Sequence, residues 1–475
     1  MTAEASRAAR VGGSRFEVVG RVRPFEVVSP GFVAVRREPG PSDGLTRSGY
    51  SPPAPYTAVE VTLGSGRGTA LAGLAADDGD HLLGFYDPRM RRVGIELRDR
   101  GTSTVLGSRR LLGRVRRIAF VLCENKPTVL VDRGRGWRPV VTGRGGNRVR
   151  PRTDLRIPAN LARFTAAWGS RGGTSEVRLV RAGLFGMAGL RDLHLVQHAD
   201  GAPYLRDGRM FLTATCAGLG FFRQAHWGVF AFDPTELAGQ PGQLRLEQVA
   251  HLFSRRDGKL FGDHAGQLVR DGDRWLVAVS SWGNFSPRRG VYVRHATTTD
   301  DLLTGVHILD TELAPMPTAR GSYDPGVTLI DGRWHVSYVE SVSHKPSQFH
   351  PALAVGPEGA EHWTQGLQRV GEADDLAFCE GPILARPDGP DGEWRVLASD
   401  GRARCYPVFD LAMRRVGSLD AFYGTNLPHP QVVDLPDGGQ ALITFDGTPY
   451  AKRRLGYGTH GDVVVMCPGG DGETG

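Results

Sequence analysis

A short unit recurs five times in the second half of the chain. Each copy has a polar or acidic residue, a few apolar residues, an Asp-Gly turn and a further apolar strand. The turns begin at Asp207, Asp271, Asp331, Asp391 and Asp437, at steps of 64, 60, 60 and 46 residues. An Asp-Gly pair between two apolar runs is among the strongest sequence signals for a β-hairpin. Five such hairpins, each followed by room for two more strands, predict a five-bladed β-propeller over residues 191–475.

The first half of the chain has a different pattern. Short, partly alternating apolar runs, such as VEVTLGSG, LLGFYD and RIAFVL, are separated by Gly, Asp or Pro. No helical period is sustained between them, so strands are expected. The sequence therefore predicts an all-β protein, with a lectin-like β-sandwich over residues 1–190 followed by the propeller.

Charge supports a boundary near residues 185–195. Residues 1–190 hold 32 Lys and Arg against 16 Asp and Glu, whereas the remainder holds 26 against 35. Arginines concentrate over residues 109–152, which is typical of a surface for an anionic partner such as nucleic acid or an acidic glycan. A solvated face, or docking against the acidic second half, explains the same pattern. Aromatic residues do not interleave with these arginines as a base-stacking surface requires, so nucleic acid is not the expected partner.

Several classes of protein are not favoured by the sequence. No apolar run is long enough for a transmembrane helix. The first twenty residues contain no apolar segment typical of a secretory signal, so a cytoplasmic protein is expected. The five cysteines are scattered without a CxxC pair, and no HExxH, P-loop, strand-linked GxGxxG or GxSxG motif occurs.

The repeat also places the polar residues that open each predicted first strand. These residues are Asp200, Asp263, Asp324, Glu380 and His429. The first strand of each blade lies beside the central axis, so matched registers would bring all five to one end of the channel. Carboxyl groups gathered there raise one another's pKa, which suits a general acid beside a general base. The alternative is that each Asp only caps a turn.

The order of these residues resembles glycoside hydrolase family 43 over about residues 192–467. The motifs SYDPGVTLIDGRWHVSYV and CEGPILARPDG carry the resemblance. It implies that Asp200 is the general base, that Asp324 orients and tunes the acid, and that Glu380 is the general acid. It also implies that His429 helps to hold a calcium ion or its waters, with no other cofactor required.

The function expected from this reading is inverting hydrolysis of furanosides or short pentose-containing glycans. A protonated Glu380 is needed near neutral pH, and Asp324 is expected to raise its pKa. Asp263, His264, Trp282, Tyr323 and His429 are expected to contact a carbohydrate or a glycosylated small molecule. Two alternatives stay open: a non-hydrolytic enzyme that tailors or cyclises a small metabolite, and a carbohydrate-binding scaffold without activity.

Overall fold

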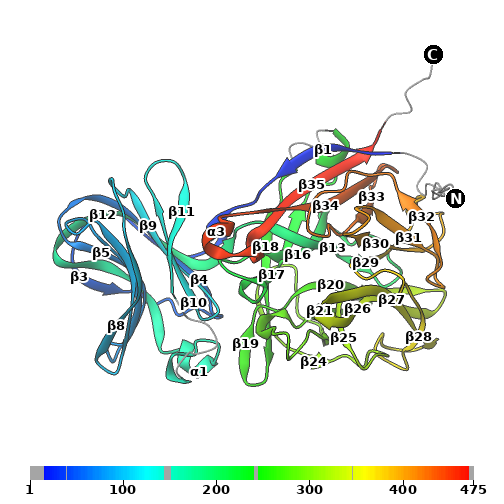
Figure 1. The fold of residues 1–475 in the computed structure, drawn as a ribbon, viewed down its shortest axis with the longest axis horizontal. Coiled ribbons are helices and arrows are strands. Elements are labelled where there is room, and N and C mark those ends of the chain that lie inside the picture. Colours follow the sequence, from blue (N-terminus) through cyan, green and yellow to red (C-terminus); the bar gives the residue numbers. More distant parts are fainter. Residues whose placement is uncertain (1–14, 39, 144–150, 240–243, 345, 470–475) are drawn as a thin grey trace, which may run out of the picture.

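The computed structural model describes residues 15–38, 40–143, 151–239, 244–344 and 346–469, and these form an almost entirely β structure (Figure 1). The α-helices in this part of the chain are short: α1 (Pro158–Leu161), α2 (Thr235–Gly239) and α3 (Lys452–Leu455). No helix in the described ranges has the length and apolar character needed to cross a membrane. The predicted all-β class with a propeller is confirmed.

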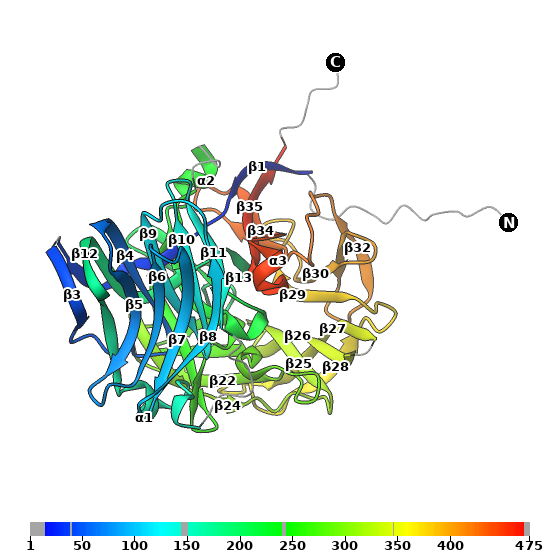
Figure 2. The ribbon, with the colours of Figure 1, turned by 60° about the vertical axis from the view of Figure 1, so that its left-hand side comes forward.

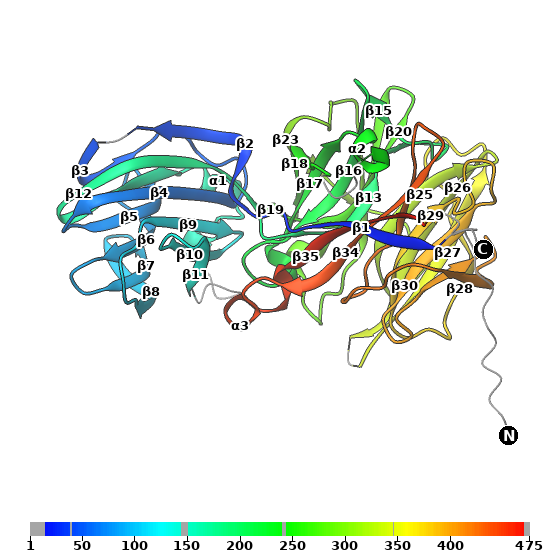
Figure 3. The ribbon, with the colours of Figure 1, turned by 90° about the horizontal axis from the view of Figure 1, so that it is seen from above.

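The N-terminal β domain is built around one long strand, β12 (Phe164–Met187). Its first part pairs with β5 and β3, and its second part pairs with β4 and β2. The resulting sheet is arranged in two layers (Figure 3) that enclose an apolar core containing Val59, Leu74, Phe120 and Val129. The other strands are β2 (Glu26–Arg37), β3 (Gly40–Arg47), β4 (Tyr56–Gly66), β5 (Thr69–Ala76), β6 (His81–Asp87), β7 (Arg92–Asp99), β8 (Thr102–Arg110), β9 (Arg117–Cys123), β10 (Lys126–Asp132) and β11 (Trp137–Thr142).

The propeller consists of five sheets, which we call blades one to five in chain order. Blade one is β13 (Leu190–Leu195), β15 (Leu205–Arg206), β16 (Arg209–Cys216), β17 (His226–Phe232), β18 (Glu247–Arg256), β19 (Lys259–Phe261) and β23 (Gly305–Asp310). Blade two is β14 (Gln197–His198), β20 (His264–Asp271), β21 (Arg274–Ser280), β22 (Val293–Thr298) and β24 (Glu312–Leu313). Blade three is β25 (Gly321–Ile330), β26 (Arg333–His344), β27 (Ser347–Glu358) and β28 (Gln368–Glu372).

Blades four and five complete the ring. Blade four is β29 (Cys379–Ala385), β30 (Arg395–Asp400), β31 (Tyr406–Phe409) and β32 (Arg415–Leu419). Blade five is β33 (Gln431–Asp434), β34 (Gln440–Pro449), β35 (His460–Pro468) and β1 (Phe16–Val22). The first strands β13, β20, β25, β29 and β33 contact one another in sequence, and β33 contacts β13 again. The central channel is therefore enclosed by these strands.

The strand β1 comes from the other end of the chain and pairs antiparallel with β35 (Figure 1). Phe16 is buried with Ile383, Leu442 and Met466, so this strand is part of the core between blades four and five. Phe16–Val22 lies within the range 1–190 predicted for the first domain, and the structure pairs it in blade five (Figure 2). The N-terminal β domain is inserted between β1 and β13.

Candidate active site

A cavity of about 350 Å³ opens at the end of the channel where the first strands begin. Its walls are mainly aromatic, and its polar groups include three carboxyl groups from three blades. The lining residues include Asp192 of β13, Asp324 of β25 and Glu380 of β29, with Arg191, Phe222, His264, Trp282, Phe285, Tyr323, Phe349, Phe378, Asn426, Phe445, Tyr457 and His460. Carboxyl groups within an aromatic-walled cavity suit acid–base chemistry on a ligand with apolar faces.

The same backbone irregularity occurs near the start of four first strands. Asp192, Ala265, Asp324 and Gly381 all have positive φ, between 50° and 64°. At each of these positions the register with the neighbouring strand shifts, as in a β-bulge. Bulges turn side chains out of the ordinary alternation and are frequent beside active sites. Here they place Asp192 and Asp324 at equivalent points of blades one and three.

The three carboxyl groups have close polar neighbours. Asp192 Oδ2 lies 3.3 Å from Arg191 Nε, and Asp324 Oδ2 lies 3.4 Å from His429 Nε2. The Tyr323 hydroxyl donates a hydrogen bond of 3.3 Å to Glu380 Oε2. The backbone amide of Asp324 donates to the Ser280 hydroxyl at 2.9 Å, which fixes the bulge that carries this carboxyl group.

The electrostatic environment separates the pKa values of the two outer carboxyl groups. Burial raises the pKa of Asp192, but the charge of Arg191, with smaller effects from His429 and His264, holds it below its usual value. Burial, and then the negative charge of Asp192, raise the pKa of Glu380 to about 8. Near neutral pH, Asp192 is therefore ionised while Glu380 holds its proton.

Asp324 and Glu380 influence each other electrostatically. Burial, and then the charges of Glu380 and Asp192, raise the pKa of Asp324 well above its usual value. The interaction between two carboxyl groups is mutual, so Asp324 and Glu380 share the tendency to hold a proton next to the ionised Asp192.

Asp200, expected as the general base, does not line this cavity. It is exposed on the turn after β14, where its Oδ1 accepts a hydrogen bond of 3.0 Å from the Ala202 amide. It lines a separate cavity of about 250 Å³ with the final residues of β29 and β33. Because the first strands run side by side, Asp200 lies at the opposite end of the channel. Its role is that of a turn residue.

The other predicted substrate contacts divide into two groups. His264, Trp282 and Tyr323 line the cavity. Asp263 does not line it, because its carboxylate is buried against Arg256, with contacts of 2.6 and 2.8 Å, and accepts a further hydrogen bond from the Gly283 amide. The structure thus gives Asp263 an internal ion pair in place of a substrate contact.

His429 is buried next to Asp324 and Asp192 and does not itself line the cavity. Its Nε2 is 3.4 Å from Asp324 and 3.8 Å from Asp192, while its Nδ1 is buried without a hydrogen-bond partner among the described residues. Calcium prefers six to eight oxygen ligands. The described side chains around His429 are an imidazole and two carboxylates, and their ligand atoms do not all lie close enough to one another to share one ion. They therefore do not fit direct coordination of calcium.

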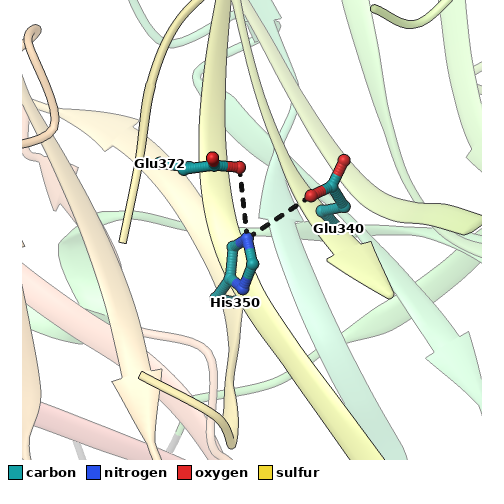
Figure 4. Close-up of side chains that lie close together, drawn as sticks. All are labelled: Glu340, His350 and Glu372. Carbon is teal, nitrogen blue, oxygen red and sulfur yellow. Dashed lines mark hydrogen bonds and ion pairs between the residues drawn. The ribbon is translucent and has the colours of Figure 1, made fainter. Parts of the chain in front are cut away.

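Three potential metal ligands do gather on the outer strands of blade three (Figure 4). His350 Nε2 lies 3.5 Å from Glu340 and 3.4 Å from Glu372. Arg320 and Arg369 also lie 3.5 and 3.4 Å from Glu340, and Arg369 pairs with Glu372 as well. The two guanidinium groups neutralise the carboxylates, so this cluster is a structural ion network.

Asp192 and its neighbour Arg191 were not identified from the sequence, and both line the cavity. Arg191 is only 2% exposed, donates from Nη1 to the Gly458 carbonyl at 2.8 Å, and stacks 5.5 Å from the centre of the Phe222 ring. Its Nη2 is buried without a partner among the described residues. When the two Asp residues are aligned, LRDLHL shares with SYDPGVTL only the Asp and the apolar residue three positions later, so the sequence carries little signal for Asp192.

Comparison with known proteins finds similarity in fold alone. No family model and no curated protein matches the chain. An alpha-L-arabinanase of Penicillium chrysogenum, solved with arabinobiose, is 11% identical with a TM-score of 0.37, over 95% of this chain and 98% of that one. A GH43_1 enzyme from Xanthomonas citri is 17% identical with a TM-score of 0.37, over 58% and 88%. An alpha-L-arabinofuranosidase from Lactobacillus brevis is 11% identical with a TM-score of 0.40, over 59% and 91%. The roles of the site residues are therefore assigned from the geometry of this chain.

Proposed function

We propose that the protein is an inverting glycoside hydrolase, with Asp192 as general base and Glu380 as general acid. The observation that carries this proposal is the pair of carboxyl groups in one cavity whose pKa values are moved in opposite directions. Such a pair supplies the ionised base and the protonated acid that glycosidic cleavage requires at the same pH.

In the proposed mechanism, the Asp192 carboxylate takes a proton from a water molecule as that water attacks the anomeric carbon. Glu380 gives its proton to the departing glycosidic oxygen on the other side of the sugar. The sugar is released with inverted configuration in a single displacement. Asp324 and Tyr323 position Glu380 and keep its surroundings poor in water.

The expected substrates are furanosides or short pentose-containing glycans. The cavity volume of about 350 Å³ lies at the small end of the range for ligand pockets, which suits a short glycan. The rings of Trp282 and Tyr323 meet edge to face at 5.3 Å and form an apolar wall on which a sugar face can pack.

The proposed function is tested by hydrolysis of aryl glycosides, with α-L-arabinofuranoside and β-D-xyloside in the panel. Proton NMR during the first turnovers should show the anomer opposite to that of the substrate. Release of the retained anomer would overturn the inverting mechanism. No turnover of any panel member by the folded protein would overturn the hydrolase assignment and favour the binding scaffold or the tailoring enzyme.

The pH profile of kcat/KM provides a separate prediction. Activity should fall as the pH rises through about 8, because Glu380 then loses the proton that it must donate. On the acid side, activity should persist to below pH 4, because Asp192 stays ionised below the usual aspartate pKa. Initial rates between pH 3 and 10 measure both limbs. An alkaline limb centred near pH 5 would contradict the assignment of Glu380 as the acid.

A further inference from the structure

A second, larger cavity of about 1130 Å³ lies between the N-terminal β domain and the propeller. One wall is formed by the end of β8, residues 111–116 and the turn from β10 into β11, and the other by Tyr450 and α3. Figures 1 and 3 show α3 next to β11 at this junction. We call this cavity the arginine groove, because its lining includes Arg109, Arg114, Arg116, Arg133, Arg135, Arg138, Arg453 and Arg454.

The eight guanidinium groups are not neutralised by carboxylates of the described residues. All eight side chains are exposed, and no Asp or Glu is among the described residues that line the groove. None of the eight forms an ion pair with a carboxylate within the described ranges, whereas Arg117, directly beneath the groove, pairs with Glu60 and Asp132. The acidic second half of the chain therefore does not cover this surface.

The positive charges come from both domains and act on one another. Burial and the charges of Arg109 and Arg453 lower the pKa of Arg454, although Arg109 and Arg454 belong to different domains. Uncompensated like charges at a domain junction oppose association of the two domains. An anionic ligand in the groove would offset this repulsion. It would also accept charge-assisted, bidentate hydrogen bonds from the guanidinium groups.

We propose that the arginine groove binds an anionic polysaccharide, a chain that carries carboxylate or sulfate groups along its length. The volume of the groove exceeds that of pockets for drug-sized ligands, so an extended chain fits it better than a single small anion. The binding is independent of the proposed hydrolase activity, because it requires only the exposed guanidinium groups.

The aromatic residues of the groove argue for a glycan over nucleic acid. The Trp137 ring is covered by the Arg117 guanidinium at 4.5 Å. The Tyr450 hydroxyl donates to the Trp137 carbonyl at 2.7 Å, and its ring packs against Phe25. Each ring is therefore engaged by a neighbouring side chain, and the two rings are not arranged as a row on which successive bases could stack. The α-helix that contributes to the groove in the described part of the chain, α3, has four residues and is too short to read a duplex.

The groove also adjoins the candidate active site. The segment that begins with α3 continues directly into Tyr457 and His460, which line the active-site cavity. Within that cavity, the buried Nη2 of Arg191 has no partner among the described residues. The cavity thus adds one guanidinium nitrogen without a partner among the described residues, although the Nε of Arg191 pairs with Asp192.

The test measures binding of the full-length protein to four polymers by titration calorimetry at low and physiological salt. The polymers are polygalacturonate, dextran sulfate, neutral arabinan and single-stranded DNA. We expect one or both anionic glycans to bind, with affinity that falls steeply as salt increases, and arabinan not to bind to the groove. Preference for polygalacturonate or for dextran sulfate distinguishes a carboxylated from a sulfated ligand.

Paired variants locate the binding surface. The double variant Arg135→Ala/Arg138→Ala should weaken binding at least about tenfold and make it less dependent on salt. The matched control Arg36→Ala/Arg67→Ala removes two exposed arginines of the same domain outside the groove and should change affinity less than about twofold. Thermal melting verifies that both variants are folded. The proposal would be overturned if neither anionic glycan bound. It would also be overturned if both double variants lost affinity equally, or if DNA bound more tightly than either anionic glycan.

Discussion

Replacement of Asp192 by Asn is expected to lower kcat for glycoside hydrolysis by about 10²–10⁴-fold, the usual contribution of a general base. The amide has nearly the same shape but cannot accept the proton of the attacking water. It also removes the negative charge that helps to raise the pKa of Glu380. The alkaline limb of any residual activity should therefore move to lower pH. Initial rates on an aryl glycoside across pH measure both effects.

The matched control is Asp200→Asn, the same chemical change at the opposite end of the channel. Because Asp200 is exposed and only caps a turn, this variant should keep wild-type kcat and KM. Loss of turnover in Asp200→Asn with retention in Asp192→Asn would reverse the assignment of the base. Folding of both variants is verified by thermal melting, because Asp192 is itself part of a bulge.

Replacement of Glu380 by Gln is expected to have opposite effects on rate and stability. The rate on glycosides with a sugar leaving group should fall by about 10²–10⁴-fold, because no proton is delivered. The rate on p-nitrophenyl glycosides should fall much less, because that leaving group departs without protonation. Rates measured side by side on a pentose disaccharide and on its p-nitrophenyl counterpart test this difference. Equal losses on both would contradict the role of Glu380 as acid.

The stability effect of Glu380→Gln follows from its raised pKa. The folded protein holds the Glu380 proton up to about pH 8, whereas the unfolded chain releases it near 4.5. The contribution to the free energy of unfolding is therefore present below about pH 4.5 and is lost as the pH rises towards 8. Glutamine does not titrate, so the variant should be more stable than wild type at pH 8.5, on the order of 5 kcal/mol, and similar at pH 4. Denaturant unfolding at both pH values measures the difference in the free energy of unfolding. If the variant were no more stable than wild type at pH 8.5, the pKa of Glu380 would not be raised in the folded protein.

The sequence was sufficient for those parts of the site that follow the hairpin signal directly. Asp324 opens a first strand that leads, without interruption, into the turn at Asp331, so counting back from the turn finds the correct carboxyl group. In blade one the chain leaves β13 and runs through residues 197–206 before its hairpin turn at Asp207. Counting back from that turn therefore leads to Asp200, whereas Asp192 falls at the domain boundary predicted near residues 185–195.

Long-range pairing was the part of the fold that no local pattern could indicate. The segment FEVVGRV has the composition of many β-strands, and its partner β35 lies more than 400 residues further along the chain. Strand propensity depends on the surface that covers a strand, so it does not identify a partner. The positions of Arg191 and the arginine groove depend on the same tertiary packing. Their charges were visible in the sequence, but their lack of carboxylate neighbours was not.

The pairing of β1 with β35 has a consequence for biosynthesis. The ribosome makes β1 before any other strand of the propeller and β35 after all the rest, so blade five stays incomplete until translation of the described chain is almost finished. During that time β1 is an unpaired edge with valine side chains, the kind of segment that associates with other nascent chains. Contacts between segments so distant in sequence also slow folding. Production of this protein should therefore depend strongly on temperature and on chaperone supply, even though its individual hairpins are local and form early.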